Sequence, residues 1–281
     1  MINLTHTISE TRVAIEKQKS EGKTIGFVPT MGALHEGHLV LIRQAAAEND
    51  FVAVSIFVNP IQFNNPEDLA RYPRTLEDDL LKLGGTGCNL VFAPSAQEMY
   101  PEPDVTEFDF GNLDKVMEGK FRPGHFRGVA IVVKKLFEIV TPHKAYFGEK
   151  DFQQLAIIKK MVSMLKMPVQ IVPCPIVRET DGLAMSSRNA RLTPEERAEA
   201  PAIYKALSAV KENYSWFIPE GVKQLVTGEI QENHFFRVEY ADVVDAETLQ
   251  PLHEWQDAEH AVVCIAAFIG NVRLIDNIIL Y

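Results

Sequence analysis

The strongest constraint on the fold lies in one stretch, Phe27-Val28-Pro29-Thr30-Met31-Gly32-Ala33-Leu34-His35-Glu36-Gly37-His38. It begins within a short apolar run, Thr24–Val28, which predicts a buried strand. It leads into apolar residues with helical spacing that extend through Ala47. We therefore predict a strand, a glycine-containing loop and a helix that opens near Glu36. The N-terminus of a helix provides unpaired N–H groups and a partial positive charge, which suit a phosphate group.

Two glycines and two histidines give this loop its predicted chemistry. Gly32 and Gly37 allow the backbone to approach a ligand closely. His35 and His38 lie three positions apart, so both face the same side of a helical turn. Their imidazoles can donate hydrogen bonds to phosphate oxygens whose charge grows during a displacement reaction. Two polar histidines at a helix start remain the simpler alternative, but the position after the first strand favours a phosphate site.

The N-terminal part of the chain alternates strands with helices. Residues 51–58 form a nearly continuous apolar run, which predicts a strand covered on both faces, as in a parallel sheet. Strand, helix and strand form a right-handed βαβ unit by default. Further strands are expected at 89–94, 144–147 and 169–172, and helices at 7–20, 75–83, 129–140 and after 154. Capping-box spacing marks helix starts at Thr7/Glu10, Thr75/Asp78 and Thr193/Glu196.

The C-terminal part has a different pattern. We expect an α/β protein with a Rossmann-like parallel-sheet domain over 1–176 and a smaller α+β domain over 177–281. One helix is predicted from Thr193 through Val210. Residues 236–240 alternate as a strand, and two apolar runs flank Gly270-Asn271, which predicts an antiparallel hairpin. Trp216 and Trp255 are expected in the core of this domain.

Composition excludes several classes of protein. The formal net charge of −10 argues against broad nucleic-acid binding, so any bound anion must be met by local basic groups. No apolar run has the length of a membrane span, and no signal peptide is apparent at the start, so we expect a cytoplasmic protein with no membrane partner. Cys88, Cys174 and Cys264 are few, separated and embedded in apolar sequence, which predicts reduced core thiols.

Polar residues follow the second predicted strand, and others lie at the start of the next predicted helix. Asn59 and Gln62 leave the carboxyl end of that strand, where open α/β sheets bind ligands, and we expect them to reach a small polar substrate. A loop amide bonded to its own turn is the alternative for Gln62. Asp78 and Asp79 either complement the dipole of their helix or contribute to a magnesium site.

Two further clusters suit a triphosphate. Residues 148–154 follow the fourth predicted strand, where Lys150 can deliver charge to a phosphate, although a lone lysine commonly lies on the surface. Ser186, Ser187 and Arg188 provide two hydroxyls and a planar guanidinium, which form a phosphate clamp. Neither a P-loop nor a G-x-S-x-G nucleophile motif is present. The sequence therefore indicates a nucleoside triphosphate site in which a substrate oxygen attacks the α-phosphorus directly.

These motifs resemble a known family. Pro29–His38 is similar to the HIGH signature of the class I synthetase and nucleotidylyltransferase superfamily, and Met185–Asn189 is similar to its KMSKS counterpart. Together with Phe57–Phe63, Tyr72–Thr75 and Gly148–Gln154, they resemble the pantoate–β-alanine ligase family over essentially the whole chain.

The resemblance implies a ligase reaction in two steps. ATP and pantoate give pantoyl adenylate and pyrophosphate; the amine of β-alanine then attacks the acyl carbon, which yields pantothenate, a coenzyme A precursor, and AMP. It also implies Mg²⁺ as a cofactor, a homodimer, and a C-terminal domain that acts as a lid.

Residue roles carry over with the motifs. Catalytic roles are implied for His38, His35, Lys150 and Arg188. ATP-binding roles are implied for Met31, Gly32, Ala33, Leu34, His35, Glu36, Gly37, His38, Gly148, Glu149, Lys150, Asp151, Val177, Met185, Ser186, Ser187 and Arg188. Pantoate is assigned to Gln62 and Gln154, and magnesium to Asp78 and Asp79.

Three other functions are alternatives to the ligase. A nucleotidylyltransferase shares the first half-reaction, and consumption of β-alanine with formation of AMP separates it from a ligase. A class I tRNA synthetase is disfavoured because no further domain is apparent and the charge is wrong for tRNA. A non-catalytic module would bind nucleotide without releasing pyrophosphate.

Overall fold

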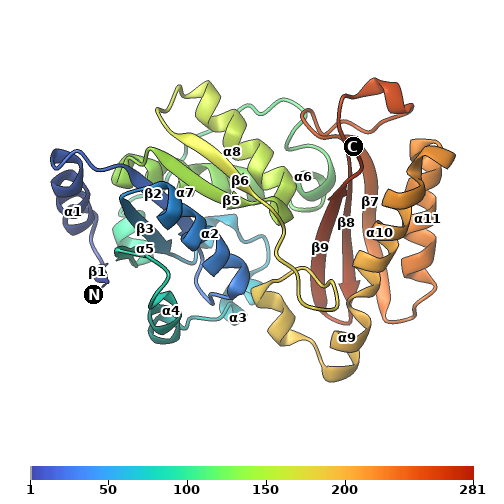
Figure 1. Cartoon of the computed structure of the whole chain (residues 1–281), viewed down its shortest axis with the longest axis horizontal. Coiled ribbons are helices and arrows are strands. Elements are labelled where there is room, and N and C mark those ends of the chain that lie inside the picture. The colour runs from blue at the N-terminus through green and yellow to red at the C-terminus, as the bar shows by residue number, and fades with distance from the viewer. Residues whose placement is uncertain (1) are drawn as a thin grey trace. The chain divides into compact units, whose positions relative to one another are not determined.

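The computed structural model describes residues 2–281, which divide into two compact units (Figure 1). Unit 1 comprises the residues up to 110 together with 122–149 and 157–175. Unit 2 comprises 111–121, 150–156 and 176–281. The predicted division treats each domain as continuous, whereas two short segments of the N-terminal half belong to unit 2.

Unit 1 contains a six-stranded parallel sheet in the order β1-β4-β3-β2-β5-β6. Its strands are β1 (Asn3–Thr5), β2 (Ile25–Thr30), β3 (Phe51–Ile56), β4 (Leu90–Phe92), β5 (Lys144–Gly148) and β6 (Gln170–Cys174). The Rossmann-like parallel sheet is thus confirmed, as are all five predicted strands. The sequence analysis missed β1, because a three-residue strand is too short to show a pattern.

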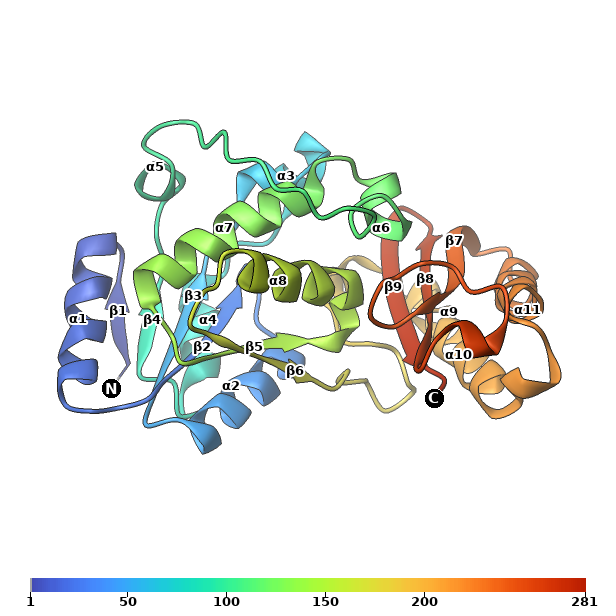
Figure 2. The same ribbon diagram turned by 90° about the horizontal axis from the view of Figure 1, so that it is seen from above.

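Helices cover both faces of this sheet. On β2, Val28 faces a core shared with Leu41 and Ile42 of α2, while the neighbouring Phe27 packs edge to face with Phe137 of α7, with ring centroids 6.3 Å apart. Alternate side chains of a strand point to opposite faces, so α2 and α7 lie on opposite sides (Figure 2). The helices are α1 (Ile8–Ser20), α2 (Glu36–Glu48), α3 (Pro66–Arg71), α4 (Leu76–Leu83), α5 (Ala96–Met99), α7 (His125–Val140) and α8 (Phe152–Met164), which begins in unit 2.

Local signals predicted the starts of α1 and α9 correctly. The capping boxes at Thr7/Glu10 and Thr193/Glu196 are both formed. The predicted box at Thr75 is wrong: Thr75 makes no cap hydrogen bond, and its hydroxyl donates instead to Asp79 Oδ2 over 3.3 Å. Helix α7 begins at His125 rather than at the predicted Val129.

Unit 2 is built on a three-stranded antiparallel sheet in the order β7-β8-β9. The predicted hairpin is confirmed, since Ile269 pairs with Val272 across a turn in which Gly270 has a φ of 53°. Positive φ is easily adopted by glycine and suits this tight connection. The elements are α6 (Met117–Phe121), α9 (Pro194–Glu199), α10 (Ala202–Asn213), α11 (Pro219–Gln231), β7 (Phe236–Asp245), β8 (Ala261–Ile269) and β9 (Val272–Ile279).

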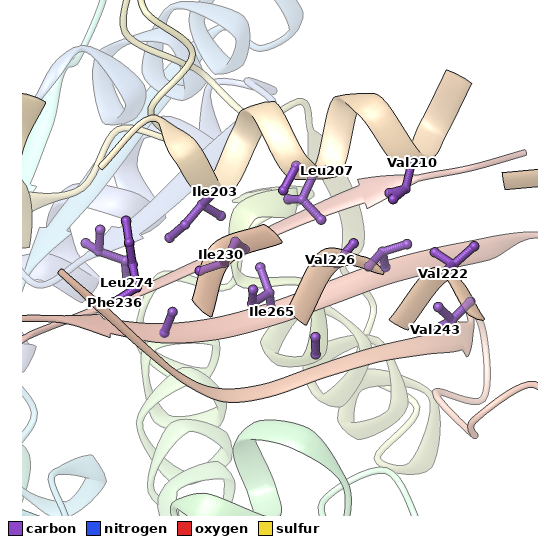
Figure 3. Packing of buried hydrophobic residues seen from close by; sticks show 14 of the residues in the cluster. Ile203, Leu207, Val210, Val222, Val226, Ile230, Phe236, Val243, Ile265 and Leu274 are labelled. Carbon is purple, nitrogen blue, oxygen red and sulfur yellow. The ribbon is translucent and has the colours of Figure 1, made fainter. Parts of the chain in front are cut away.

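The central strand β8 is buried on both faces. Ile265 lies in the core that α10 and α11 form with the sheet (Figure 3), whereas its neighbour Cys264 packs in a second cluster with Met117 and Phe152. The segments 111–121 and 150–156 therefore belong to unit 2 because they cover the other face of its sheet. No sequence pattern indicated this packing.

Two predictions about unit 2 are wrong. The helix expected from Thr193 through Val210 is divided between α9 and α10, since Pro201 has no amide hydrogen to continue the ladder. Trp216 is 78% exposed rather than part of the core, whereas Trp255 packs against that core as expected.

The cysteines are free thiols in buried positions, as predicted. Burial raises the pKa of Cys88 and of Cys174 to about 12, so both thiols stay protonated near neutral pH. None of the helices within residues 2–281 combines the length and the apolar character that a membrane crossing requires.

A largely buried ionic network ties α6 to the sheet of unit 2. The Arg273 guanidinium donates to Glu118 over 2.6 and 2.9 Å and to Glu239 over 2.6 Å. The Tyr240 hydroxyl donates to Glu118 over 2.9 Å. Two carboxylates thus share the Arg273 guanidinium.

We expect Arg273→Ala to lower the free energy of unfolding by about 3–5 kcal/mol, because it removes the guanidinium that two partly desolvated carboxylates share. A urea titration measures the change. Lys223→Ala removes a more exposed pair with Asp242 and serves as the control, with an expected loss below about 1 kcal/mol. Equal losses in the two variants would contradict a stabilising role for the network.

Candidate functional site

Three of the predicted polar clusters lie at the carboxyl edge of the unit 1 sheet. Strand β2 pairs with β3 on one side and with β5 on the other. The chain runs from β2 through β3 to β4 and then returns to β5, so the strand order reverses between β2 and β5. Open α/β sheets bind ligands outside the carboxyl ends of their strands at such a point. The loop after β2, the turn after β3 and the residues Gly148 and Glu149 share this edge.

The loop between β2 and α2 is held by side chains. Four successive backbone amides donate to side-chain acceptors: Gly32 to Thr30 Oγ1 over 3.2 Å, Ala33 to Asp79 Oδ2 over 2.9 Å, Leu34 to Asp79 Oδ1 over 2.7 Å and His35 to His38 Nδ1 over 3.3 Å. Gly32 and Ala33 both have left-handed backbone conformations, with φ of 80° and 50°. The loop is therefore fixed residue by residue.

This arrangement limits which backbone amides of the loop are available to a phosphate group. The amides of residues 32–35 already have acceptors inside the protein, so they are not available to a phosphate group. Leu34 is only 1% exposed and anchors the loop in the core. The loop presents its imidazoles instead, together with the N–H groups of Glu36 and Gly37, the first two helical positions, which have no intrahelical acceptor.

The two histidines lie side by side at the start of α2, as predicted. Their ring centroids are 4.0 Å apart, and His35 is the N-cap residue of the helix. Because His38 Nδ1 accepts a hydrogen bond from the His35 amide, a neutral His38 ring carries its proton on Nε2. His38 is therefore set up to donate from Nε2 to a phosphate oxygen.

Asn59 is buried in the turn after β3 and orients its neighbour. It is 1% exposed, and its amide nitrogen donates to Gln62 Oε1 and to the carbonyl of Gly128, both over 3.1 Å. Its oxygen accepts from the Tyr100 hydroxyl over 2.9 Å. Both amide hydrogens are used within the protein, so the predicted contact between Asn59 and substrate does not fit the structure. Asn59 instead fixes the direction of the Gln62 amide.

Gln62 presents its amide hydrogens toward the loop after β2. Its Nε2 lies 3.2 Å from Met31 Sδ, which is a weak acceptor. A substrate oxygen can therefore take this hydrogen bond at little cost. His125 Nδ1 lies 2.8 Å from the Gln62 carbonyl oxygen, and a Cβ on Gly128 would lie 2.6 Å from the Ile61 carbonyl oxygen. The first turn of α7 thus packs directly on this turn and fixes its backbone.

The two predicted metal ligands differ in accessibility. Asp79 has no exposed surface, and both of its oxygens accept from the loop after β2. Asp78 is exposed. Within residues 2–281, no three or more His, Cys, Asp or Glu side chains gather as a metal site. Asp79 therefore does not fit the predicted role as a magnesium ligand, and Asp78 alone remains as a candidate.

The other predicted ATP residues belong to unit 2. The Met185 amide donates to the Val177 carbonyl over 3.0 Å, so these two predicted ATP contacts lie on neighbouring segments. Ser186 caps the following 3₁₀ turn, with its Oγ accepting from the Arg188 amide over 3.2 Å. The segment Met185–Arg188 is therefore ordered locally.

Strand β9 anchors both predicted ATP segments of unit 2. Asp276 accepts two hydrogen bonds from Arg178, of 2.6 and 2.9 Å, and Asn277 donates to the Lys150 carbonyl over 3.0 Å. Burial raises the pKa of the Asp276 carboxyl, although the hydrogen bond from Arg178 opposes the shift. Gln153, beside the predicted pantoate ligand Gln154, is buried and holds the backbone of 113–118.

Sequence reasoning missed several supporting residues. Thr30 had a usable signal, because a threonine two positions before a glycine can accept from its amide. Tyr100, Asp276 and Asn277 had none, since their partners lie far away in the chain.

Comparisons with known proteins agree with this geometry. The family model described as pantoate-beta-alanine ligase matches residues 3–279. Pantothenate synthetase of Porphyromonas gingivalis is 53% identical over 273 residues, which cover 97% of each chain. That of Cytophaga hutchinsonii is 47% identical over 282 residues, covering 100% of this chain and 99% of its own.

Solved structures show the same fold. Pantothenate synthetase from Thermus thermophilus superimposes with a TM-score of 0.93 at 44% identity, and each chain is covered completely. The ligase from Francisella tularensis, solved with Beta-gamma ATP and β-alanine, has a TM-score of 0.83 at 34% identity and covers 100% of this chain and 98% of its own. The chain belongs to the pantoate–β-alanine ligase family.

Proposed function

We propose that this chain condenses pantoate with β-alanine at the expense of ATP, through a pantoyl-adenylate intermediate, and releases AMP and pyrophosphate. One observation carries the proposal: two imidazoles stand side by side at the start of α2, at the edge where the strand order reverses. The Gln62 amide on the next turn points to the same loop. Family membership over residues 3–279 supports the choice of substrates.

Adenylation makes the carboxylate of pantoate reactive toward an amine. A carboxylate is a poor acyl donor because its leaving group would be oxide, whereas AMP is a good leaving group. The cysteines are buried, and burial raises their thiol pKa values, so none offers a thiolate for a covalent acyl intermediate. The protein therefore needs to orient the substrates and stabilise charge rather than supply a nucleophile.

In the first step, we assign the developing phosphate charge to four side chains. His38 donates from Nε2, and His35, Lys150 and Arg188 supply further positive charge or hydrogen bonds. Gln62 and Gln154 hold the pantoate oxygens so that the carboxylate faces the α-phosphorus. The remaining ATP contacts are assigned to Met31, Gly32, Ala33, Glu36, Gly37, Gly148, Glu149, Asp151, Val177, Met185, Ser186 and Ser187.

In the second step, the amine of β-alanine attacks the acyl carbon and AMP leaves. Gln62, which orients pantoate, also lies near the incoming amine in this scheme. We propose that Mg²⁺ enters as the counter-ion of the ATP phosphates, with Asp78 as the one accessible carboxylate of its predicted pair. No step here depends on a metal held by Asp79.

We also propose a homodimer in the cytoplasm, on the strength of the family resemblance. Sedimentation equilibrium of the purified chain tests the assembly, and a mass of one 31.6 kDa chain would contradict it.

Labelling the pantoate carboxyl group with heavy oxygen tests the intermediate. We expect one labelled oxygen in the released AMP, because the bond from acid oxygen to phosphorus survives when the amine attacks carbon. Mass spectrometry of the AMP measures this. Unlabelled AMP would exclude the adenylate, and accumulation of a stable dinucleotide would favour a nucleotidylyltransferase.

We expect His38→Ala to slow adenylate formation about 100-fold, because phosphate charge grows only in that step. Amide formation from supplied pantoyl adenylate should be affected much less. Rapid-quench measurement of the two half-reactions separates the effects. His253→Ala, at an exposed position, is the control, and equal damage to both half-reactions would contradict the role of His38.

We expect Lys150→Ala to lose most turnover and to fold normally, because Lys150 is partly exposed and supports phosphate chemistry rather than the core. Steady-state kcat and circular dichroism check this. Lys159→Ala, exposed on the same stretch of chain, should retain activity. A near-normal kcat for Lys150→Ala would remove it from the site.

A further inference from the structure

We propose that Asp79 is a positioning residue for the adenylation step. Its carboxylate fills an anion site made by the backbone of the loop after β2, and by filling it sets the positions of His35 and His38. The proposal rests on the proposed function for what the two histidines do.

The loop has the geometry of a backbone anion site. Gly32 and Ala33 follow one another with φ of 80° and 50°, and the amides of Ala33 and Leu34 converge on a single carboxylate. Successive backbone amides that converge in a turn form a concave nest that binds anions. Here the anion belongs to the chain itself, so a phosphate group is excluded from the nest and must be met by other groups, among them the two imidazoles.

The carboxylate fits closely into this nest. A Cβ added to Gly32 would lie 3.1 Å from Asp79 Oδ2 and 3.0 Å from Ile56 Cγ2. The left-handed conformation of Ala33 is unfavourable for a residue with a Cβ, and the hydrogen bonds to Asp79 hold it there. Asp79 is completely buried, where a carboxylate needs donors around it. The Thr75 hydroxyl is the third of these donors.

Two side chains of helix α4 hold the amide and the carbonyl of Leu34, the residue before His35. The Leu34 amide donates to Asp79 over 2.7 Å, and the Leu34 carbonyl accepts from Lys82 Nζ over 2.7 Å. Asp79 and Lys82 are three residues apart on α4, so one helical turn provides both contacts.

The position of the Leu34 peptide groups determines where the two imidazoles lie. His35 follows it in the chain, and the His35 carbonyl accepts from the amides of His38 and Leu39 over 2.9 and 3.2 Å. The His35 amide also orients the His38 ring through Nδ1. A loosened Leu34 amide therefore displaces both rings relative to the start of α2.

Asp79→Asn is the sharpest test, because it keeps the shape of the side chain. An amide group has only one oxygen and sets an NH₂ against one of the two loop amides. We expect adenylate formation to fall about 100-fold, as small misplacements of catalytic groups can cause. Amide formation from supplied pantoyl adenylate and the Mg²⁺ concentration for half-maximal activity should stay close to those of the parent enzyme.

Glu77→Gln is the matched control, since it removes the same charge from an exposed position on the same helix. It should leave both half-reactions unchanged. Asp79→Ala provides a second readout, because formate can occupy the emptied nest. We expect formate, but not chloride at equal ionic strength, to restore adenylate formation severalfold.

Each contrary outcome overturns the proposal. A higher Mg²⁺ requirement in Asp79→Asn would make Asp79 a metal ligand. Equal loss of both half-reactions, failure of both variants to fold, or no rescue by formate would leave Asp79 with a merely structural role. If the parent enzyme forms no pantoyl adenylate, the proposed function fails. If it does and Asp79→Asn matches it, only the assignment of Asp79 fails.

Discussion

A backbone N–H turned away from water needs an acceptor, and the loop after β2 is organised by this requirement. Its four amides all find side-chain oxygens or a ring nitrogen, supplied by Thr30, Asp79 and His38. The result is a rigid connection between a buried strand and a helix. Because these four amides are satisfied internally, the loop offers a ligand its imidazoles and the first N–H groups of α2.

The same principle recurs at the turn after β3. Asn59 and Tyr100 use their polar atoms on each other and on Gln62, so one glutamine amide is left pointing in a defined direction. In unit 2, Asp276 and Asn277 of β9 fix Arg178 and the Lys150 backbone. In each case, hydrogen bonds from buried polar residues fix the position of a more accessible residue. Rigid support of this kind reduces the ordering that substrate binding would otherwise require.

Local patterns predicted much of the fold. Apolar runs indicated five strands of the parallel sheet, and Gly270-Asn271 indicated the hairpin of unit 2. Cap residues marked the starts of α1 and α9. The failures also have physical causes. Strand β1 is too short for a pattern, and the box expected at Thr75 is absent because its hydroxyl is directed to Asp79.

The sequence by itself determined which residues are assigned catalytic and binding roles. The motifs around His35, Gln62, Lys150 and Ser186 are each contiguous in the chain, so they can be recognised without a structure. Only the tertiary structure decided how they are supported. It buried Asn59 and Asp79 and directed them to the backbone and Gln62 rather than to a ligand. The physical reason is that a polar side chain's role depends on which donors and acceptors surround it. Those partners come from distant parts of the chain, so no local pattern reports them.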